Sequence, residues 1–337
     1  MILTRTPFRV SFVGGGSDLP SFYSKYGGAV LSATINKYMY ISVHPYFNKS
    51  LINLKYSKTE LVDNIEKLQH PIVRETLKYL SIDSGIEITS TADVPSGTGL
   101  GSSSAFTVGL LHTLYGFKSK LVTKERLANE ACMVEIEKVK SPIGKQDQYA
   151  SAYGGLNCIV FEKDGDVEVN QIVIQKKIRR ELEQNLLLFY TGHQRDTNSI
   201  LKEQNQIIGQ DKKINVLKEM AGLAQKMRDV LINEDLISFG ELLNINWNLK
   251  KSISNSISNS KINDYYKKAI QNGAIGGKLL GAGGGGFLLF YCEPEKQGLL
   301  RMALSDLYEL KFNFDKEGTK LVYFTDESIE GKGFFNN

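Results

Sequence analysis

The feature that most constrains this chain is a glycine-rich segment between a predicted strand and a predicted helix. The segment, Val94 to Leu110, has Gly97, Gly99 and Gly101 at alternate positions, followed by three serines. Glycine removes the side chains that keep an anion away from the backbone, and the first amide groups of a helix lack intrahelical partners. Because the amino-terminal end of a helix also carries partial positive charge, the segment predicts a polyphosphate-binding loop.

The sequence around the loop agrees with that interpretation. Upstream, Ile86, Ile88 and Ala92 alternate with polar residues as in a half-buried strand, and Pro95 ends the strand. No Gly-Lys-Ser or Gly-Lys-Thr follows, so the segment is not a P-loop, and the third glycine of a dinucleotide fingerprint is absent. Taken alone, the segment also fits a tight turn in which Ser102 only caps a helix.

Composition narrows the class of protein. The net charge of the 337 residues is +4, too small an excess for nucleic-acid binding, and the basic residues are interspersed along the chain. No signal sequence or run of eighteen apolar residues occurs, so we expect neither export nor a membrane partner. Cys132, Cys158 and Cys292 are widely spaced and predict free thiols in the cytoplasm. Whether copies of the chain form a homo-oligomer stays open.

Strand-like and helical stretches are segregated along the chain, which predicts an α+β protein with two lobes. Thr123 is a plausible amino-terminal cap for one of the helices. Strands are expected at 3–13, 29–35, 38–44, 51–56, 86–92, 156–161, 167–174, 186–190, 276–280 and 287–291, and helices at 17–26, 102–115, 123–139, 198–208, 214–232, 236–250 and 262–272. A serine- and asparagine-rich tract, 252–260, is either a plain polar loop or a loop that closes over a ligand.

Three further clusters carry chemistry. A second glycine-rich run, Gly276 to Phe287, is either a strained hairpin or a place where backbone approaches a ligand. Near the amino terminus, a predicted strand carrying Arg9 ends in three glycines and Asp18. Arg9 suits a transferring phosphoryl group and Asp18 suits sugar hydroxyls, although a surface strand residue and a helix cap would look the same.

The last cluster is a proline- and glycine-bearing loop, Ser141 to Ala150, that leads into a short helical patch. Asp147 in this loop is a candidate to accept or orient a hydroxyl proton. Glu135, a few turns earlier, is a candidate cation ligand.

Together the four clusters resemble the GHMP kinase superfamily in both motif and order, across roughly residues 1 to 330. The amino-terminal Arg-Val-Ser-Phe-Val-Gly-Gly-Gly-Ser-Asp-Leu-Pro is similar to the branch that contains the heptose 7-phosphate kinases and the fucokinases. The resemblance implies a ribosomal-protein-type α/β lobe, expected at residues 1–190, and a ferredoxin-like lobe, expected at 191–337. The active site is expected between the two lobes.

The resemblance also assigns roles to residues. Asp147 and Arg9 would be catalytic, and Ser103 and Glu135 would hold magnesium. Ser104 stands where relatives have alanine, so the serine assignment is open to a shift of one, and Glu137 is a weaker alternative to Glu135. ATP would bind at Pro95, Gly97, Thr98, Gly99, Leu100, Gly101, Ser102, Ser103 and Ser104. The acceptor would bind at Gly15, Gly16, Ser17, Asp18, Arg195, Gly283 and Gly284.

The implied activity is ATP-dependent phosphorylation of the anomeric hydroxyl of D-glycero-D-manno-heptose 7-phosphate, for nucleotide-activated heptose and surface polysaccharide synthesis. The alternatives are a fucokinase-like or other free-sugar kinase, a mevalonate-type kinase, and an inactive kinase-like sensor. A phosphorylated acceptor needs a second anion site, because the ATP loop is already occupied. The candidate cations are Lys138, Lys140, Lys145, Arg195, Lys250 and Lys251.

Overall fold

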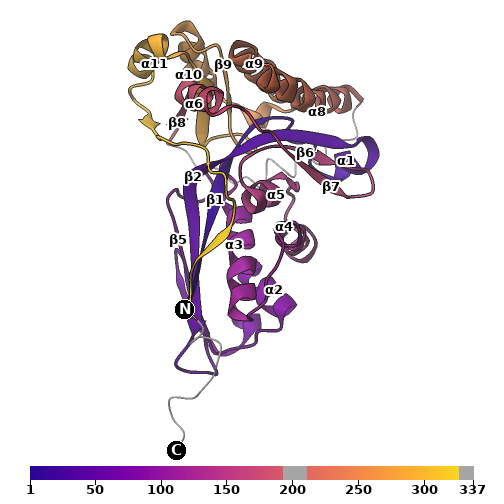
Figure 1. The fold of residues 1–337 in the computed structure, drawn as a ribbon, viewed down its shortest axis with the longest axis vertical. Helices are drawn as coiled ribbons and strands as arrows, with labels where there is room; N and C mark the ends of the chain where they lie inside the picture. The colour runs from indigo at the N-terminus through magenta and orange to yellow at the C-terminus, as the bar shows by residue number, and fades with distance from the viewer. Residues whose placement is uncertain (193–210, 326–337) are drawn as a thin grey trace, which may run out of the picture.

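The larger of two sheets forms the lower lobe of an elongated molecule (Figure 1). The computed structural model describes residues 1–192 and 211–325. Within them, the eight strands of this sheet are β1 (Ile2–Val13), β2 (Gly28–Pro45), β3 (Ile52–Lys55), β4 (Thr59–Val62), β5 (Ile86–Ala92), β6 (Leu156–Phe161), β7 (Val167–Gln171) and β12 (Lys320–Phe324). Their order is β12-β1-β2-β5-β3-β4, and β6 pairs with both β2 and β7.

Strand β2 has a bulge in its pairing with β1, and it also pairs with two further strands, β5 and β6. Pro7 of β1 pairs with Tyr38, whereas the next residue, Phe8, pairs with Ile35. The carboxyl half of β2 pairs with β5 and the amino half pairs with β6. The two separate strands expected from the sequence are therefore the two halves of one strand, because a bulge interrupts the pairing without ending the strand.

Helices cover one face of the lower sheet (Figure 1). The long helix α3 packs against β1 and β2 and is buried over most of its length. Thr123 caps the next helix as predicted, since its side chain accepts a hydrogen bond from the Arg126 amide. The helical elements of this lobe are α1 (Pro20–Tyr26), η1 (Ile65–Lys67), α2 (Pro71–Leu80), α3 (Ser102–Phe117), α4 (Lys124–Cys132), the π-helical turn η2 (Met133–Lys138) and α5 (Gln146–Tyr153).

The upper lobe is built on a second, antiparallel sheet with its own apolar core around Trp247. Its strands are β8 (Leu186–Tyr190), β9 (Gly276–Leu279), β10 (Phe287–Tyr291) and β11 (Tyr308–Glu309), in the order β11-β8-β10-β9. Its helices are α6 (Lys176–Asn185), α8 (Asp211–Ile232), α9 (Leu236–Ile253), η3 (Asn255–Ile257), α10 (Ser260–Gln271), η4 (Pro294–Lys296) and α11 (Gln297–Ala303).

The α+β architecture with two lobes is confirmed, but the lobes do not divide at residue 190. Strand β8 lies before that boundary and pairs with β10 in the upper sheet, because its apolar residues are buried there. Strand β12 lies after the boundary and returns to pair with β1. The helix expected at 198–208 lies outside the described residues.

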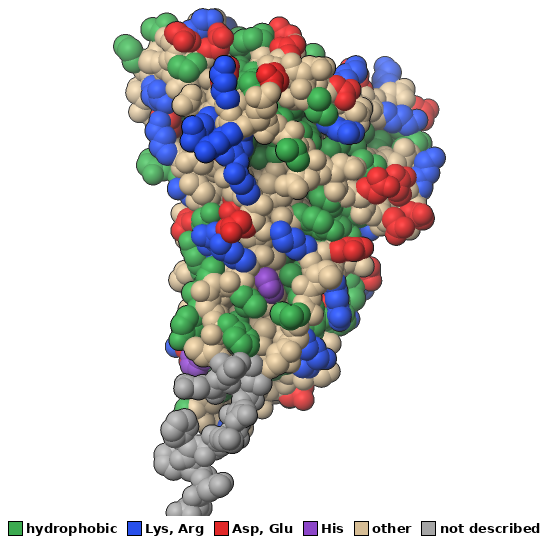
Figure 2. Space-filling model, viewed as in Figure 1, with side chains coloured by type: hydrophobic (Ala, Val, Ile, Leu, Met, Phe, Trp, Pro, Cys, Tyr) green, Lys and Arg blue, Asp and Glu red, His purple; other side chains and the backbone are tan. Residues whose placement is uncertain are grey.

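Other expectations from composition concern the surface and the thiols. No helix in the described parts of the chain is long and apolar enough to cross a membrane. Cys132, Cys158 and Cys292 are free and buried. On the face shown in Figure 2, basic side chains are interspersed with acidic and hydrophobic ones over both lobes.

Candidate active site

A cavity with a volume of about 950 Å³ lies where the two lobes meet. From the lower lobe it is lined by the carboxyl half of β1, the start of α5 and the loop of residues 93–101, here called the glycine loop. From the upper lobe it is lined by α9, β9 and the residues after β9. The four clusters singled out in the sequence therefore meet at one cavity.

The glycine loop needs its glycines for two different reasons. Gly97, Gly99 and Gly101 all have positive φ, at +74°, +88° and +76°, which strains other residues. At Gly99 a Cβ atom would also lie 2.5 Å from the carbonyl oxygen of Leu280. The loop thus touches the late glycine run of the upper lobe, and it leads directly into the amino terminus of α3.

Most of the predicted ATP-binding residues line the cavity. The exceptions are Thr98 and Leu100, whose side chains are almost fully buried and do not line it. Thr98 instead donates a hydrogen bond to the Pro95 carbonyl within the loop. The residues that do line the cavity are Pro95, Gly97, Gly99, Gly101, Ser102, Ser103 and Ser104.

Arg9 and Asp147 form a bidentate ion pair beside the glycine loop. Arg9 Nε lies 2.6 Å from Asp147 Oδ1, and Arg9 Nη2 lies 2.6 Å from Asp147 Oδ2. Arg9 Nη1 donates to the Gly99 carbonyl at 2.6 Å. Arg9 is 4% exposed, so it is not a surface strand residue. This arrangement fixes a carboxylate at the amino terminus of α3, where a phosphate would bind.

Glu135 is a buried carboxylate on the π-helical turn η2. Its Oε1 accepts a hydrogen bond from Ser103 Oγ at 2.6 Å, and its Oε2 accepts one from Gln148 Nε2 at 2.7 Å. Burial raises the pKa of Glu135 to about 6, and the hydroxyls of Ser103 and Ser104 oppose that shift. Glu137 is exposed. A carboxylate with hydroxyl neighbours supplies the hard oxygen donors that Mg²⁺ takes alongside phosphate.

Asp18 joins the amino-terminal glycines to the loop before α5. Its Oδ1 accepts a hydrogen bond from the Gly16 amide at 2.9 Å, and its Oδ2 accepts one from the Gln146 amide at 3.4 Å. It does not cap α1, whose cap residue is Leu19. Burial raises the pKa of Asp18 above its usual range, and Asp147 adds to the shift.

Two buried polar atoms beside Asp18 have no partner. Ser11 Oγ and Gln146 Oε1 are both buried and unbonded in the structure, and both residues line the cavity. A Cβ on Gly15 would lie 3.7 Å from Gln146 Nε2 and 3.8 Å from Ser11 Oγ, so the three residues are neighbours. Unpartnered buried polar atoms at a cavity suit a ligand that carries hydroxyls. The sequence did not point to Ser11 or Gln146.

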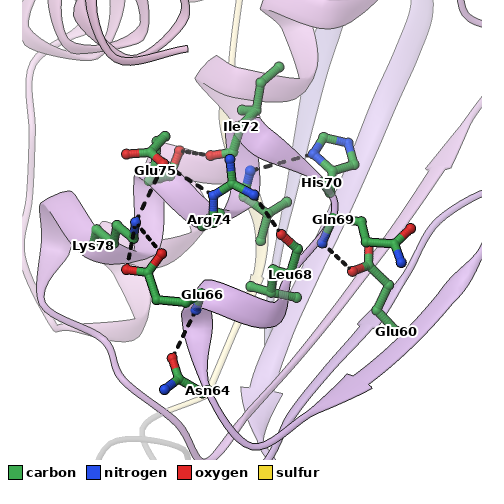
Figure 3. Close-up of polar contacts among 12 residues, drawn as sticks. Glu60, Asn64, Glu66, Leu68, Gln69, His70, Ile72, Arg74, Glu75 and Lys78 are labelled. Atoms are coloured by element: carbon green, nitrogen blue, oxygen red, sulfur yellow. Dashed lines mark hydrogen bonds and ion pairs between the residues drawn. The ribbon is translucent and has the colours of Figure 1, made fainter.

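The opposite end of the cavity is aromatic. His70 stacks on Phe106 with ring centroids 4.9 Å apart, and Tyr56 meets His70 edge-on at 4.9 Å. The corner between η1 and α2 supports His70 (Figure 3). There the Gln69 amide donates to Glu60 at 2.6 Å, and His70 Nδ1 accepts from the Val73 amide.

Among the described residues, three of those predicted to bind the acceptor do not line the cavity. Ser17 is fully buried, and its Oγ donates to the Gly14 carbonyl at 2.8 Å within its own turn. Gly283 and Gly284 pack instead against Ile257, because the Gly284 amide donates to the Ile257 carbonyl at 2.9 Å. The serine- and asparagine-rich tract therefore lies against the late glycine run. Arg195 lies outside the described residues.

Among the described basic candidates, only Lys250 lines the cavity. Lys138 lies over the Tyr79 ring, and Lys145 donates to the Gly165 carbonyl at 2.7 Å. Lys251 lies over the rings of Trp247 and Tyr266, and Lys140 is exposed. A second cavity lysine, Lys278, was not expected, because it stands inside the glycine-rich run.

The family is shown by comparison with known proteins. Residues 67–155 match the GHMP kinases N terminal domain, and residues 227–309 match the GHMP kinases C terminal domain. The chain is 33% identical over 336 residues to a D-glycero-alpha-D-manno-heptose 7-phosphate kinase of Campylobacter jejuni, covering 95% of this chain and 98% of that protein. The chain belongs to the GHMP kinase family. It is therefore an ATP-dependent kinase.

Solved structures of GHMP kinases share its fold. A putative sugar kinase from Campylobacter jejuni is 30% identical with a TM-score of 0.76, covering 95% of this chain and 97% of that chain. A D-glycero-D-manno-heptose 1-phosphate kinase from Bacteroides thetaiotaomicron is 24% identical with a TM-score of 0.80, covering 96% of this chain and 100% of that chain. The fold expected from the sequence motifs is confirmed.

Proposed function

We propose that this GHMP kinase transfers the γ-phosphoryl group of ATP to the anomeric hydroxyl of D-glycero-D-manno-heptose 7-phosphate, giving the 1,7-bisphosphate. The observation that carries the proposal is the Asp147 carboxylate, held by Arg9 beside Gly101 at the end of the glycine loop. A hydroxyl placed against Asp147 faces the phosphate-binding end of α3. The heptose is supported by the 33% identity to the heptose 7-phosphate kinase.

The reaction requires little covalent chemistry from the protein. The acceptor oxygen attacks the γ-phosphorus, the bond to the bridging oxygen breaks, and ADP leaves. Asp147 orients the hydroxyl and accepts its proton, while Arg9 keeps the carboxylate in place and supplies positive charge. An anomeric hydroxyl is more acidic than an ordinary alcohol, which reduces the basicity that Asp147 must provide.

The nucleotide would extend from the glycine loop to the aromatic end of the cavity. The amide groups at the start of α3 suit its phosphates, and His70, Phe106 and Tyr56 offer an apolar surface to its base.

Magnesium is the proposed metal cofactor, with Ser103 and Glu135 as the residues that would hold it. The fit rests on a buried carboxylate that, within the described residues, has hydroxyl and amide partners but no basic side chain. When bound, Mg²⁺ would neutralise charge on the nucleotide phosphates.

We place the reaction in the cytoplasm, where three free buried thiols stay reduced. Its product would serve nucleotide-activated heptose and surface polysaccharide synthesis.

The test is an acceptor panel assayed with ATP and Mg²⁺, containing heptose 7-phosphate, unphosphorylated heptose, mannose, fucose and mevalonate. Phosphorus NMR should show the fastest transfer to heptose 7-phosphate and a new phosphate resonance coupled to the anomeric proton. Faster turnover of fucose or mevalonate, or phosphate on another oxygen, would refute the proposed substrate.

A further inference from the structure

Two buried lysines at the acceptor end of the cavity have no role in the mechanism above. Lys250 of α9 is 6% exposed, and Lys278 of β9 is 2% exposed. Lys250 Nζ donates to the Gly281 carbonyl, and Lys278 Nζ donates to the Phe12 carbonyl at 2.9 Å. Across the described residues neither ammonium has a carboxylate partner. Burying such charge is costly unless an anion joins it, so the lysines point to an anionic ligand.

The carboxylates near Lys250 are already bonded to other groups. Lys250 is faced by Arg9 of β1, Asp18, Asp147 of α5 and Lys278 of β9. Asp147 is paired with Arg9, and Asp18 accepts two backbone amides. The remaining N–H groups of Lys250 are therefore open to a ligand in the cavity.

Burial lowers the pKa of Lys250 to about 8, and Arg9 adds to the shift. Burial also lowers the pKa of Lys278 well below the usual lysine range, and the charges of Lys250 and Arg9 add to the shift. In both lysines, burial and a neighbouring cation disfavour the charged form, and an anion bound beside the ammonium groups would favour it.

The position of Lys250 indicates which ligand the anion belongs to. The charges that act on Lys250 are those of Arg9, Asp18 and Asp147, which line the cavity where the acceptor hydroxyl is proposed to bind. One turn earlier on α9, Asn246 Oδ1 accepts the Gly14 amide at 3.1 Å, which anchors the helix against the acceptor-binding turn.

We propose that Lys250, supported by Lys278, binds a phosphate ester on the acceptor and so makes the enzyme select a phosphorylated sugar over its unphosphorylated form. This inference rests on the proposed kinase activity and adds a specificity-determining residue to it. The Lys250 ammonium donates charge-assisted hydrogen bonds to the acceptor phosphate, and no covalent step is involved.

The test compares Lys250→Met with wild-type enzyme on heptose 7-phosphate and on unphosphorylated heptose. Lys250→Met should raise KM for the phosphorylated sugar by roughly tenfold to a hundredfold, the worth of a hydrogen bond to a charged group. The kinetics on the unphosphorylated sugar should change less than about threefold, since no such bond is lost there. Lys251→Met is the matched control, because Lys251 is the next residue of α9 and its ammonium lies over two aromatic rings.

A variant that keeps the positive charge at position 250 distinguishes a role in binding the acceptor phosphate from a role in stabilising the fold. Lys250→Arg should keep the preference for the phosphorylated sugar at high pH. In wild-type enzyme that preference should decline above the free-enzyme pKa of about 8 as the ammonium loses its proton. Thermal unfolding of Lys250→Met should occur no earlier than that of wild type, because the variant removes an unpaired buried charge.

Two results would overturn the inference. An equal loss on both sugars would place Lys250 on the phosphoryl group in transfer, and an unchanged KM for the phosphorylated sugar would remove it from binding. If wild-type enzyme does not turn over heptose, the same comparison uses mannose and mannose 6-phosphate. If the heptose assignment is wrong, the wild-type enzyme itself fails to turn over heptose 7-phosphate. If only the Lys250 assignment is wrong, the wild-type enzyme is active and Lys250→Met leaves the KM for the phosphorylated sugar unchanged.

Discussion

Arg9 and Asp147, 138 positions apart in the chain, meet through two hydrogen bonds of 2.6 Å each. Arg9 is held by β1 and Asp147 by the first turn of α5, so the pair forms only when the lower lobe is folded. The third bond of the guanidinium, to Gly99, ties the pair to the glycine loop. One side chain thus positions both the proposed catalytic carboxylate and the proposed phosphate-binding loop.

Asp147→Asn should lower kcat by roughly a hundredfold to ten-thousandfold, the range expected for loss of a general base. The amide keeps the shape of the carboxylate but cannot take the hydroxyl proton, and it loses the ion pair with Arg9. ATP should bind with nearly unchanged affinity by calorimetry, because the proposal places its phosphates on the loop rather than on Asp147. Undiminished turnover would remove Asp147 from the mechanism. Asp164→Asn, in the turn between β6 and β7, is the control and should match wild type.

Glu135→Gln should raise the Mg²⁺ concentration needed for half-maximal activity by roughly tenfold to a hundredfold. The substitution removes the negative charge that suits a divalent cation while preserving the size of the side chain. The measurement is a Mg²⁺ titration of the initial rate at saturating ATP. Glu137→Gln, two residues later and exposed, should leave the titration unchanged. Equal shifts in the two variants would contradict the assignment.

Gly99→Ala and Gly97→Ala form a matched pair that isolates the contact between the glycine loop and the upper lobe. Both glycines have positive φ, so each alanine should cost about 1–2 kcal/mol of unfolding free energy. Only at Gly99 would the Cβ collide with backbone, at 2.5 Å from Leu280 O, whereas nothing lies within 4 Å at Gly97. Denaturant unfolding should therefore show the larger loss for Gly99→Ala, together with weaker ATP binding. Similar losses of unfolding free energy in the two variants would mean that the glycine loop can move away from Leu280 without cost.

Local patterns in the sequence predicted most of the strands and the helices with clear periodicity. Helix α2 was missed, although its buried residues Ile72, Val73, Leu77 and Leu80 have helical spacing and Pro71 stands at its first position. The small strands β11 and β12 were also missed, since a short exposed strand is defined by its partner rather than by its own residues. The expected boundary at residue 190 does not separate the two sheets, because pairing with β10 and with β1 decides where β8 and β12 lie.

In the candidate site, too, some residues could be predicted from the sequence and others only from the structure. Residues within glycine-bearing motifs, such as Asp147 and Gly99, could be predicted because motif and spacing are local, and both line the cavity. Ser11, Gln146 and Lys278 carry no local signal, and only the packing of the lobes brings them to the cavity. Lys250 was one of several equivalent cations in the sequence, and its burial and its place at the cavity distinguish it.

His112 should make the protein less stable in acid. Burial lowers the pKa of His112 to about 4, and Lys124 adds to the shift, whereas the unfolded side chain titrates near 6.5. The neutral ring, 3.0 Å from Thr319 Oγ1, therefore contributes stability above pH 6.5 that is lost as the pH falls toward 4. Between pH 7.5 and 5.0 the loss should be about 2 kcal/mol by urea unfolding, and His112→Gln should remove it. Half-buried His70, whose pKa burial also lowers, acts in the same direction and leaves part of the acid sensitivity in the variant. His44→Gln, at an exposed ring, is the control, and an unchanged pH dependence in His112→Gln would refute the assignment.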